Sequence, residues 1–297
     1  MASAIAKLPS SIRGSRTLKA STVYAVRGEV RIKPGAVLTI EDGCEIRIVN
    51  GRFPNSTLRR SALIFEAGSC LNAKRFVVRA ADATMQPETV ADNAGLWFLG
   101  NSANATKDGI KLKRLAKIPP SSFHATKITT HYLGRYDAYK NIKTKKTSSW
   151  GDDIDAISLM GLSEDEWHVK AISSQNSADD GLDMTNSKIS IDRLEILAPI
   201  EDAINLSSSQ LQVKKALTID LQEISPDRHL FDLEVDDGPS YLALYKGCAV
   251  TLRGPIGNQL TLISSDIKPV KAGRRMIVRF KGRIKRKPTL IFSIGAD

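Results

Sequence analysis

Acidic residues recur in the middle of the chain, each time followed by a small residue and an apolar-polar-apolar triplet. Aligned on this pattern, Asp155, Asp180 and Asp202 take the same position, and their numbers differ by 25 and then by 22. Grouped carboxylates can serve as acid and base in glycoside hydrolysis, hold a hard cation, or accept hydrogen bonds from turn amides. The segments are IDAISL (154–159), DDGLDM (179–184) and EDAINL (201–206).

The same spacing indicates which elements position these residues. Each match is a stretch of three to five residues bounded by Gly, Asn, Asp or Ser, which is typical of a short strand between turns. Two apolar series recur at a constant step of 22, and a further segment repeats at a step of 25 near the N-terminus. These are Val169, Ile191 and Val213; Ile172, Leu194 and Ala216; and LTIEDG (38–43) with LIFEAG (63–68).

Short strands that recur at these nearly equal steps predict a solenoid, because parallel coils then stack like positions about 4.8 Å apart. The pattern resembles the right-handed parallel β-helix of pectate lyases, polygalacturonases and many phage and surface proteins. The run GEVRIKPGAVLTIEDGCEIRI (28–48) is similar to the coil that follows an N-terminal cap in such chains. A jelly roll or sandwich would not explain equal spacing in two separate regions.

The predicted organisation is all-β, in three parts. Residues 1–21 form a basic flexible tail or, as an alternative, a transit peptide. Residues 22–235 form the parallel β-helix, interrupted near 101–150 by a loop-rich excursion of the kind that carries binding surfaces on solenoids. Residues 236–297 form basic, β-rich final coils and a C-terminal cap, because the open end of a β-helix must be covered.

Strand parity places the acidic residues relative to the core. Leu182 and Met184 share a face and should point inward, which leaves Asp183 outward and Asp180 in the preceding turn. Carboxylates stacked in successive coils repel one another, so the column can share a cation, for which Ca²⁺ is the candidate. No cofactor is required. The candidate metal ligands are Asp155, Asp180 and Asp202.

A closer resemblance concerns ADDGLDM followed by EDAINL. The two segments are similar to the polygalacturonase pattern of an N-T-D-G turn and a D-D pair one coil later. The resemblance implies inverting hydrolysis, in which one carboxyl group is the acid and the others position water. The catalytic residues that it implies are Asp180, Glu201 and Asp202. A purely structural role of these turns and a cation site stay open beside this interpretation.

The chain is strongly basic, with a formal net charge of +11, and should attract polyanions. Lys and Arg concentrate at 140–150 and 267–288, and tyrosines near Arg135 could stack on sugar rings or a base. A solvated basic rim is the alternative. The candidate partner-binding residues are Tyr132, Arg135, Tyr136, Lys143, Lys145, Lys146, Arg274, Arg275, Arg279 and Arg283.

The histidines do not form an evident metal-binding pattern. His124 and His131 are separated by an odd number of positions, which on one strand places them on opposite faces. His168 follows Trp167 at the start of a strand, where we expect it to pack.

Several classes of protein are disfavoured. No apolar run approaches the ~20 residues that a transmembrane helix needs, and the first residues lack the apolar core of a signal peptide. Three cysteines without C-x-x-C spacing predict reduced thiols instead of a disulfide scaffold or zinc ribbon. We expect a cytoplasmic or phage- or virion-associated protein, with secretion by a non-classical route as an alternative.

Three functional hypotheses follow. The preferred one is a non-catalytic β-helix module whose basic loops and C-terminal region dock a polyanion or a protein partner in a larger assembly. Self-association into a homo-oligomer is compatible with it. The first alternative is a hydrolase or lyase acting on an anionic polysaccharide through the three carboxylates. The second is a nucleic-acid-associated protein that uses the same basic surface.

Overall fold

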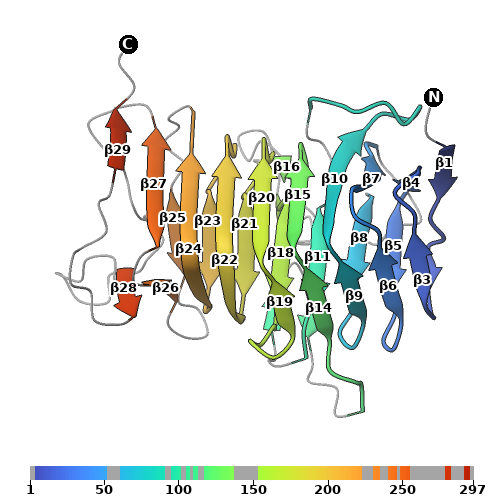
Figure 1. Ribbon diagram of the computed structural model, residues 1–297, viewed down its shortest axis with the longest axis horizontal. Coiled ribbons are helices and arrows are strands. Elements are labelled where there is room, and N and C mark those ends of the chain that lie inside the picture. The colour runs from blue at the N-terminus through green and yellow to red at the C-terminus, as the bar shows by residue number, and fades with distance from the viewer. Residues whose placement is uncertain are drawn as a thin grey trace, which may run out of the picture.

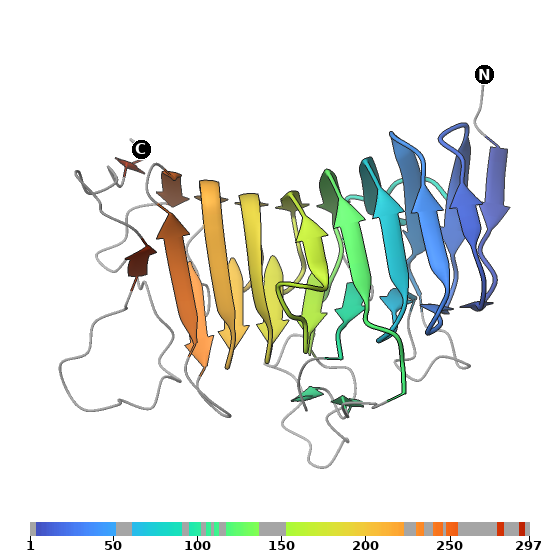
Figure 2. The same cartoon turned by 60° about the horizontal axis from the view of Figure 1, so that its bottom comes forward.

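The protein consists of β-strands stacked along one axis. In the part of the chain that the structure describes, every regular element is a strand (Figures 1 and 2). This computed structural model describes residues 4–51, 61–90, 95–101, 105–107, 110–112, 117–136, 153–222, 230–234, 240–245, 248–254, 278–281 and 291–294.

Three parallel sheets contain most of these strands. Sheet A contains, in spatial order, β1 (Ala4–Lys7), β4 (Thr22–Val26), β7 (Cys44–Val49), β10 (Arg75–Ala81), β15 (Lys127–His131), β20 (Ala171–Gln175), β22 (Lys188–Leu197), β24 (Gln210–Asp220), β26 (Tyr241–Tyr245) and β28 (Val278–Lys281). Two further strands lie off this path: β27 (Ala249–Gly254) pairs with β24, and β29 (Ile291–Ile294) pairs with β27. Sheet B contains β2 (Ser11–Ile12), β5 (Glu29–Ile32), β8 (Ala62–Phe65), β11 (Leu96–Leu99), β18 (Ile157–Met160), β21 (Leu182–Thr185), β23 (Ile204–Ser207) and β25 (Phe231–Glu234). Sheet C contains β3 (Arg16–Leu18), β6 (Val37–Ile40), β9 (Cys70–Ala73), β14 (Ser122–Ala125) and β19 (Trp167–Val169).

Two short antiparallel pairs lie within the expected excursion or at its end. They are β12 (Ala105–Lys107) with β13 (Ile110–Leu112), and β16 (Arg135–Tyr136) with β17 (Asp153–Ile154).

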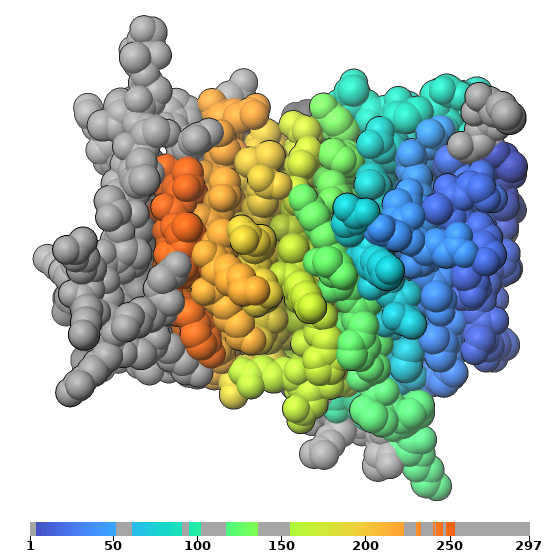
Figure 3. Space-filling view, viewed as in Figure 1, coloured from blue at the N-terminus to red at the C-terminus, as the bar shows by residue number. Residues whose placement is uncertain are grey.

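The chain passes through sheets B, C and A in turn and then begins the next coil. Thus β5, β6 and β7 form one coil, and β8, β9 and β10 pair with them in parallel. Buried and half-buried positions alternate along β5 and β6, whereas β8, β11, β18 and β21 are buried at every position, Asp183 included. The inward apolar side chains of the three sheets form one continuous core. In Figure 3 successive segments of the chain appear as neighbouring bands.

Like side chains stack in vertical files, as the regular step in the sequence predicts. Leu159 pairs with Met184 and Met184 with Leu206, and all three are fully buried. Ile191 pairs with Val213 in the same way. The stacking expected from the sequence is therefore confirmed for these positions.

The series Ile172, Leu194 and Ala216 is wrong at its last member. Ile172 does pair with Leu194, but Leu194 pairs with Leu217. The register between β22 and β24 shifts after Ile191, which adds one residue to the β24 side. A constant step cannot detect such a bulge.

The repeat near the N-terminus is also wrong, because its two members lie in different sheets. Leu38 stacks on Leu71 in sheet C, whereas Leu63 stacks on Val30 in sheet B. Both observed pairs are further apart along the chain than the repeat implies. The strand in sheet C that overlaps LTIEDG and the strand in sheet B that overlaps LIFEAG have similar compositions. The two segments therefore match in sequence although they do not pair.

Stacking also begins earlier than expected. Residues up to 21 were predicted to form a flexible tail, but β1, β2 and β3 pair in parallel with β4, β5 and β6. The inward side chains Leu8 and Leu18 are at most 1% exposed. These apolar residues are widely spaced among basic ones, so the coil is difficult to recognise by composition.

Buried and half-buried serines link successive coils at the turn that follows sheet B. The backbone N–H of Leu162 donates to Ser187 Oγ at 3.1 Å, and that of Ser187 donates to Ser209 Oγ at 3.0 Å. The N–H of Ser209 in turn donates to Ser240 Oγ at 3.1 Å. Each hydroxyl satisfies a turn amide of the preceding coil, which stabilises the corner.

The thiols are free, as expected, and two of the three are buried. Burial raises the pKa of Cys44 to about 11, and the nearby carboxylates of Glu41 and Glu45 contribute to the shift. A thiol with this pKa is protonated at neutral pH and is a poor nucleophile.

Candidate functional site

The acidic column lies in the turns that lead into sheet B. Each aspartate of the column lies two residues before its strand, as the parity argument placed Asp180: Asp155 before β18, Asp180 before β21 and Asp202 before β23. Ala156 N–H donates to the Asp180 carbonyl oxygen at 3.1 Å, and Gly181 N–H donates to that of Asp202 at 2.9 Å. These backbone bonds hold the three turns one above another.

The closest carboxylate group differs from the expected metal set by one member. Carboxylate oxygens of Asp155, Asp179 and Asp180 lie within 4.8 Å of one another, and Asp179 takes the place that we assigned to Asp202. The three side chains are only 1%, 2% and 4% exposed. Three carboxylates supply part of the six to eight oxygens that Ca²⁺ takes, so the residue types suit a hard cation.

Hydrogen bonds within the column favour a structural contribution. Ser158 Oγ donates to Asp155 Oδ2 at 3.0 Å. The N–H of Asp202 donates to Asp180 Oδ1 at 2.9 Å, which links one coil to the next. Asp180 and Asp202 are 4% and 6% exposed, and Glu201 is half-buried. Carboxyl groups this deeply covered are poorly placed to reach a polymeric substrate.

We expect Asp180→Ala to lower the free energy of unfolding by about 1–3 kcal/mol, because the buried N–H of Asp202 would lose its acceptor. Asp180→Asn keeps an acceptor oxygen and should cost much less. Thermal and urea unfolding of both variants measure the difference. Equal losses in the two variants would contradict a hydrogen-bonding role of this carboxylate.

The candidate tyrosine and arginine cluster is brought next to the acidic column. Tyr132 follows β15 with a φ of +56° and packs half-buried against the core. In the β16–β17 pair Arg135 lies opposite Ile154 and Tyr136 opposite Asp153, immediately before the first column residue. The cluster therefore adjoins the turns that carry the carboxylates.

The other candidate binding residues are described only in part or not at all. For Arg279 the structure gives the backbone of β28. The candidates outside the described residues are Lys143, Lys145, Lys146, Arg274, Arg275 and Arg283.

A second charged feature escaped the sequence analysis. Cations follow the corner where each coil passes from sheet C into sheet A, across β10, β15, β20, β22 and β24, which lie side by side in Figure 1. All of them are exposed except the half-buried Lys127. We call this set the cationic ridge: Lys74, Arg75, Lys127, Lys170, Arg193, Lys214 and Lys215.

Backbone pairing keeps the members of the cationic ridge in line. Arg75 pairs with Lys127 in register, and the N–H of Lys127 donates to the Lys74 carbonyl at 2.9 Å. The N–H of Arg193 donates to the Lys170 carbonyl at 3.0 Å. Neighbouring members are therefore about one strand spacing apart, roughly 4.8 Å along the axis.

Two acids offset part of this charge. Arg75 binds Asp42 through two hydrogen bonds of 2.8 and 2.6 Å. These bonds are the main reason why the pKa of the Asp42 carboxyl lies below its ordinary value. Lys215 Nζ lies 2.8 Å from Asp192 Oδ2. Among the described residues no ion pair is recorded for Lys74, Lys170, Arg193 or Lys214, so the cationic ridge keeps a positive excess.

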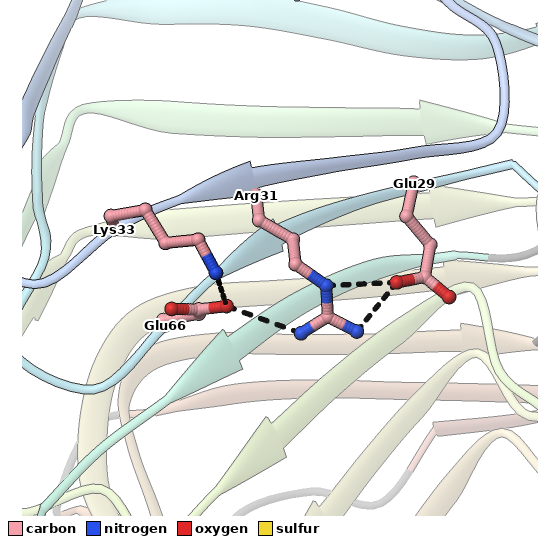
Figure 4. A network of polar contacts seen from close by, with 4 residues as sticks. All are labelled: Glu29, Arg31, Lys33 and Glu66. Atoms are coloured by element: carbon pink, nitrogen blue, oxygen red, sulfur yellow. Dashed lines mark hydrogen bonds and ion pairs between the residues drawn. The ribbon is translucent and has the colours of Figure 1, made fainter. Parts of the chain in front are cut away.

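One group of cations elsewhere on the protein is fully neutralised. On the outer face of sheet B, Arg31 joins Glu29 at 2.5 Å to Glu66 at 3.2 Å, and Lys33 binds Glu66 at 2.6 Å (Figure 4). This network is balanced in charge. The contrast indicates that charge is neutralised within the network on sheet B and is left in excess at the corner.

A signal for the cationic ridge did exist in the sequence. Arg193 directly precedes Leu194, and Lys170 comes shortly before Ile172 in the same apolar series. When the cations are aligned with this apolar series, members of the cationic ridge recur once per coil. The density of cations along the chain does not show this recurrence. Charge density along the chain is highest at 140–150 and 267–288 and does not indicate single cations that are spaced one coil apart.

The fold and its charged corners define an all-β protein built of stacked parallel coils. A scan against protein-family models found no match, and searches of curated proteins and of solved structures found no similar protein either. Within the described ranges, no helix has the length and apolar character needed to cross a membrane.

Proposed function

We propose that this protein is a non-catalytic, right-handed parallel β-helix of the pectate lyase-like kind that binds a linear polyanion along the cationic ridge. The observation that carries the proposal is the alignment of unneutralised cations at one corner of five neighbouring strands. The basic stretches 140–150 and 267–288, which lie almost wholly outside the described residues, add positive charge to the chain.

The cationic ridge suits an extended polymer better than a compact anion. Its charges advance by one strand spacing per coil, roughly 4.8 Å, and so form a row. A polymer with regular negative charges can contact several of them at once and release its counterions, which favours binding at low salt. The coils are held by backbone pairing, so aligning the row costs little conformational entropy when the polymer binds.

The enzyme hypothesis has less support from the site. Hydrolysis needs two carboxyl groups on either side of an accessible glycosidic bond, and Asp180 and Asp202 are nearly fully buried. Incubation with polyuronates tests it directly. New reducing ends, or absorbance from unsaturated products, would favour the hydrolase or lyase over the binding module.

The binding proposal is tested with a variant that removes four cations of the ridge and a control that removes four exposed cations from other parts of the fold. Both variants change the net charge equally. The ridge variant is Lys74→Gln, Lys170→Gln, Arg193→Gln and Lys214→Gln, and the control is Lys7→Gln, Arg13→Gln, Lys117→Gln and Lys188→Gln.

Fluorescence anisotropy with a labelled heparin oligosaccharide, repeated over a range of salt concentrations, gives the affinity and its salt dependence. The ridge variant should bind at least about tenfold more weakly, with a salt slope shallower by roughly 0.7–0.9 per lost contact. The control should keep most of the wild-type slope. Equal losses in both variants would show attraction by net charge alone and overturn the proposal. Single-stranded DNA as a second probe distinguishes a nucleic-acid partner from a polysaccharide.

A further inference from the structure

Two histidines far apart in the sequence form a stacked pair on the outer face of sheet C. His124 in β14 lies in register with His168 in β19 of the next coil. The ring centroids are 4.4 Å apart, the ring planes differ by 25°, and both side chains are exposed. The expectation that His168 packs is thus replaced by an exposed pair, whereas His131 lies in β15 of sheet A.

Hydrogen bonds orient both rings in a similar way. His168 Nε2 lies 3.1 Å from the Asp165 carbonyl oxygen, which can only accept, so in the neutral ring this nitrogen carries the proton. His124 Nε2 lies 2.9 Å from Ser122 Oγ, which can accept in the same sense. Within the described residues no hydrogen bond is recorded to either Nδ1. Each ring therefore has one nitrogen held by the protein and one available, the arrangement typical of metal-binding histidines.

We propose that His124 and His168 together form a binding site for a divalent transition-metal ion that prefers imidazole nitrogen, such as Cu²⁺, Ni²⁺ or Zn²⁺. An ion at about 2.0–2.1 Å from each nitrogen can hold the two nitrogens no more than roughly 4.2 Å apart. The ring centroids are 4.4 Å apart, so the two side chains are near enough to share one ion. Stacked rings direct their lone pairs nearly in parallel, so binding requires both exposed rings to turn until their Nδ1 atoms face the same ion.

The surroundings provide both attraction and repulsion. Glu164 and Asp165 are exposed in the turn before β19 and favour a cation, whereas Lys170 of the cationic ridge opposes it. Asn72 in β9 lies in register with His124 and adds an amide oxygen in the same file. Water is expected to complete the coordination sphere.

The two imidazole nitrogens set the metal preference of the site. Affinity should follow the order Cu²⁺ above Ni²⁺ and Zn²⁺.

Isothermal titration of the untagged full chain with each ion at pH 7.5 tests the site. We expect one ion per chain and a loss of affinity of about tenfold or more in either His124→Gln or His168→Gln. His131→Gln is the matched control and should bind like the wild type. Cys70→Ser is a second control, because Cys70 pairs with Ser122 beside the site.

Two results would overturn the proposal. One is unchanged affinity in both single variants, and the other is an equal loss in the His131 control. Electron paramagnetic resonance of the Cu²⁺ complex provides an independent measurement, in which coupling to two imidazole nitrogens should fall to one in each variant. The inference stands apart from polyanion binding, since it requires only these two rings.

Discussion

Phe98→Ala should lower the free energy of unfolding by about 3–5 kcal/mol, one of the largest effects of a single substitution in this protein. Phe98 is fully buried and stacks on Phe65 with ring centroids 4.8 Å apart and ring planes 9° from parallel. Its ring also meets the edges of Phe123 at 5.1 Å and Trp167 at 5.3 Å. Truncation would leave a cavity among rings from three successive coils, which rigid backbone pairing prevents from collapsing.

Urea denaturation followed by tryptophan fluorescence measures this loss, because Trp167 lies in the same cluster. Val90→Ala serves as a control, since Val90 is 64% exposed and its truncation should change stability by no more than about 0.5 kcal/mol. A loss below about 1 kcal/mol in Phe98→Ala would mean that the rings are not packed as described.

Gly95→Ala should be about as damaging, with an expected cost of about 3 kcal/mol or more. A Cβ at this position would lie 1.9 Å from the Asp155 carbonyl oxygen and 2.7 Å from that of Ala156. Both atoms belong to the backbone of the next coil, where Ala156 accepts a hydrogen bond from Leu96 N–H at 3.0 Å. Relief of the clash would separate two coils where β11 and β18 begin, beside the acidic column.

Gly14→Ala is the matched control, because a Cβ there would meet nothing within 4 Å. Its melting temperature should stay close to that of the wild type, whereas that of Gly95→Ala should fall by several degrees. Similar melting temperatures for the two variants would show that the coils are further apart at Gly95 than the structure gives.

Much of the fold could be predicted because a solenoid repeats its local environment. Leu159, Met184 and Leu206 face the core in three successive coils, so their apolar character recurs at nearly constant steps. The same regularity aligned the column of Asp155, Asp180 and Asp202. What repeats locally can be read without knowing the whole structure.

Prediction failed where pairing depends on the length of a coil. The bulge between β22 and β24 moves Leu217 into the place assigned to Ala216, and a longer coil than the repeat implies separates Leu38 from its partner Leu71. Neither change alters the composition of a strand. The predicted set of metal ligands was wrong in one member for a related reason. Among the described residues, Asp179 and not Asp202 lies with Asp155 and Asp180 in a close group of carboxylates.

The sequence by itself determined that this chain forms short strands with inward apolar positions, that coils succeed one another, and that acids recur at one turn. Only the tertiary structure decided that Lys74, Lys170 and Arg193 share one corner and that the rings of His124 and His168 meet. The physical reason is that a residue's file depends on every insertion and bulge between the coils, whereas its inward or outward direction depends only on its own strand.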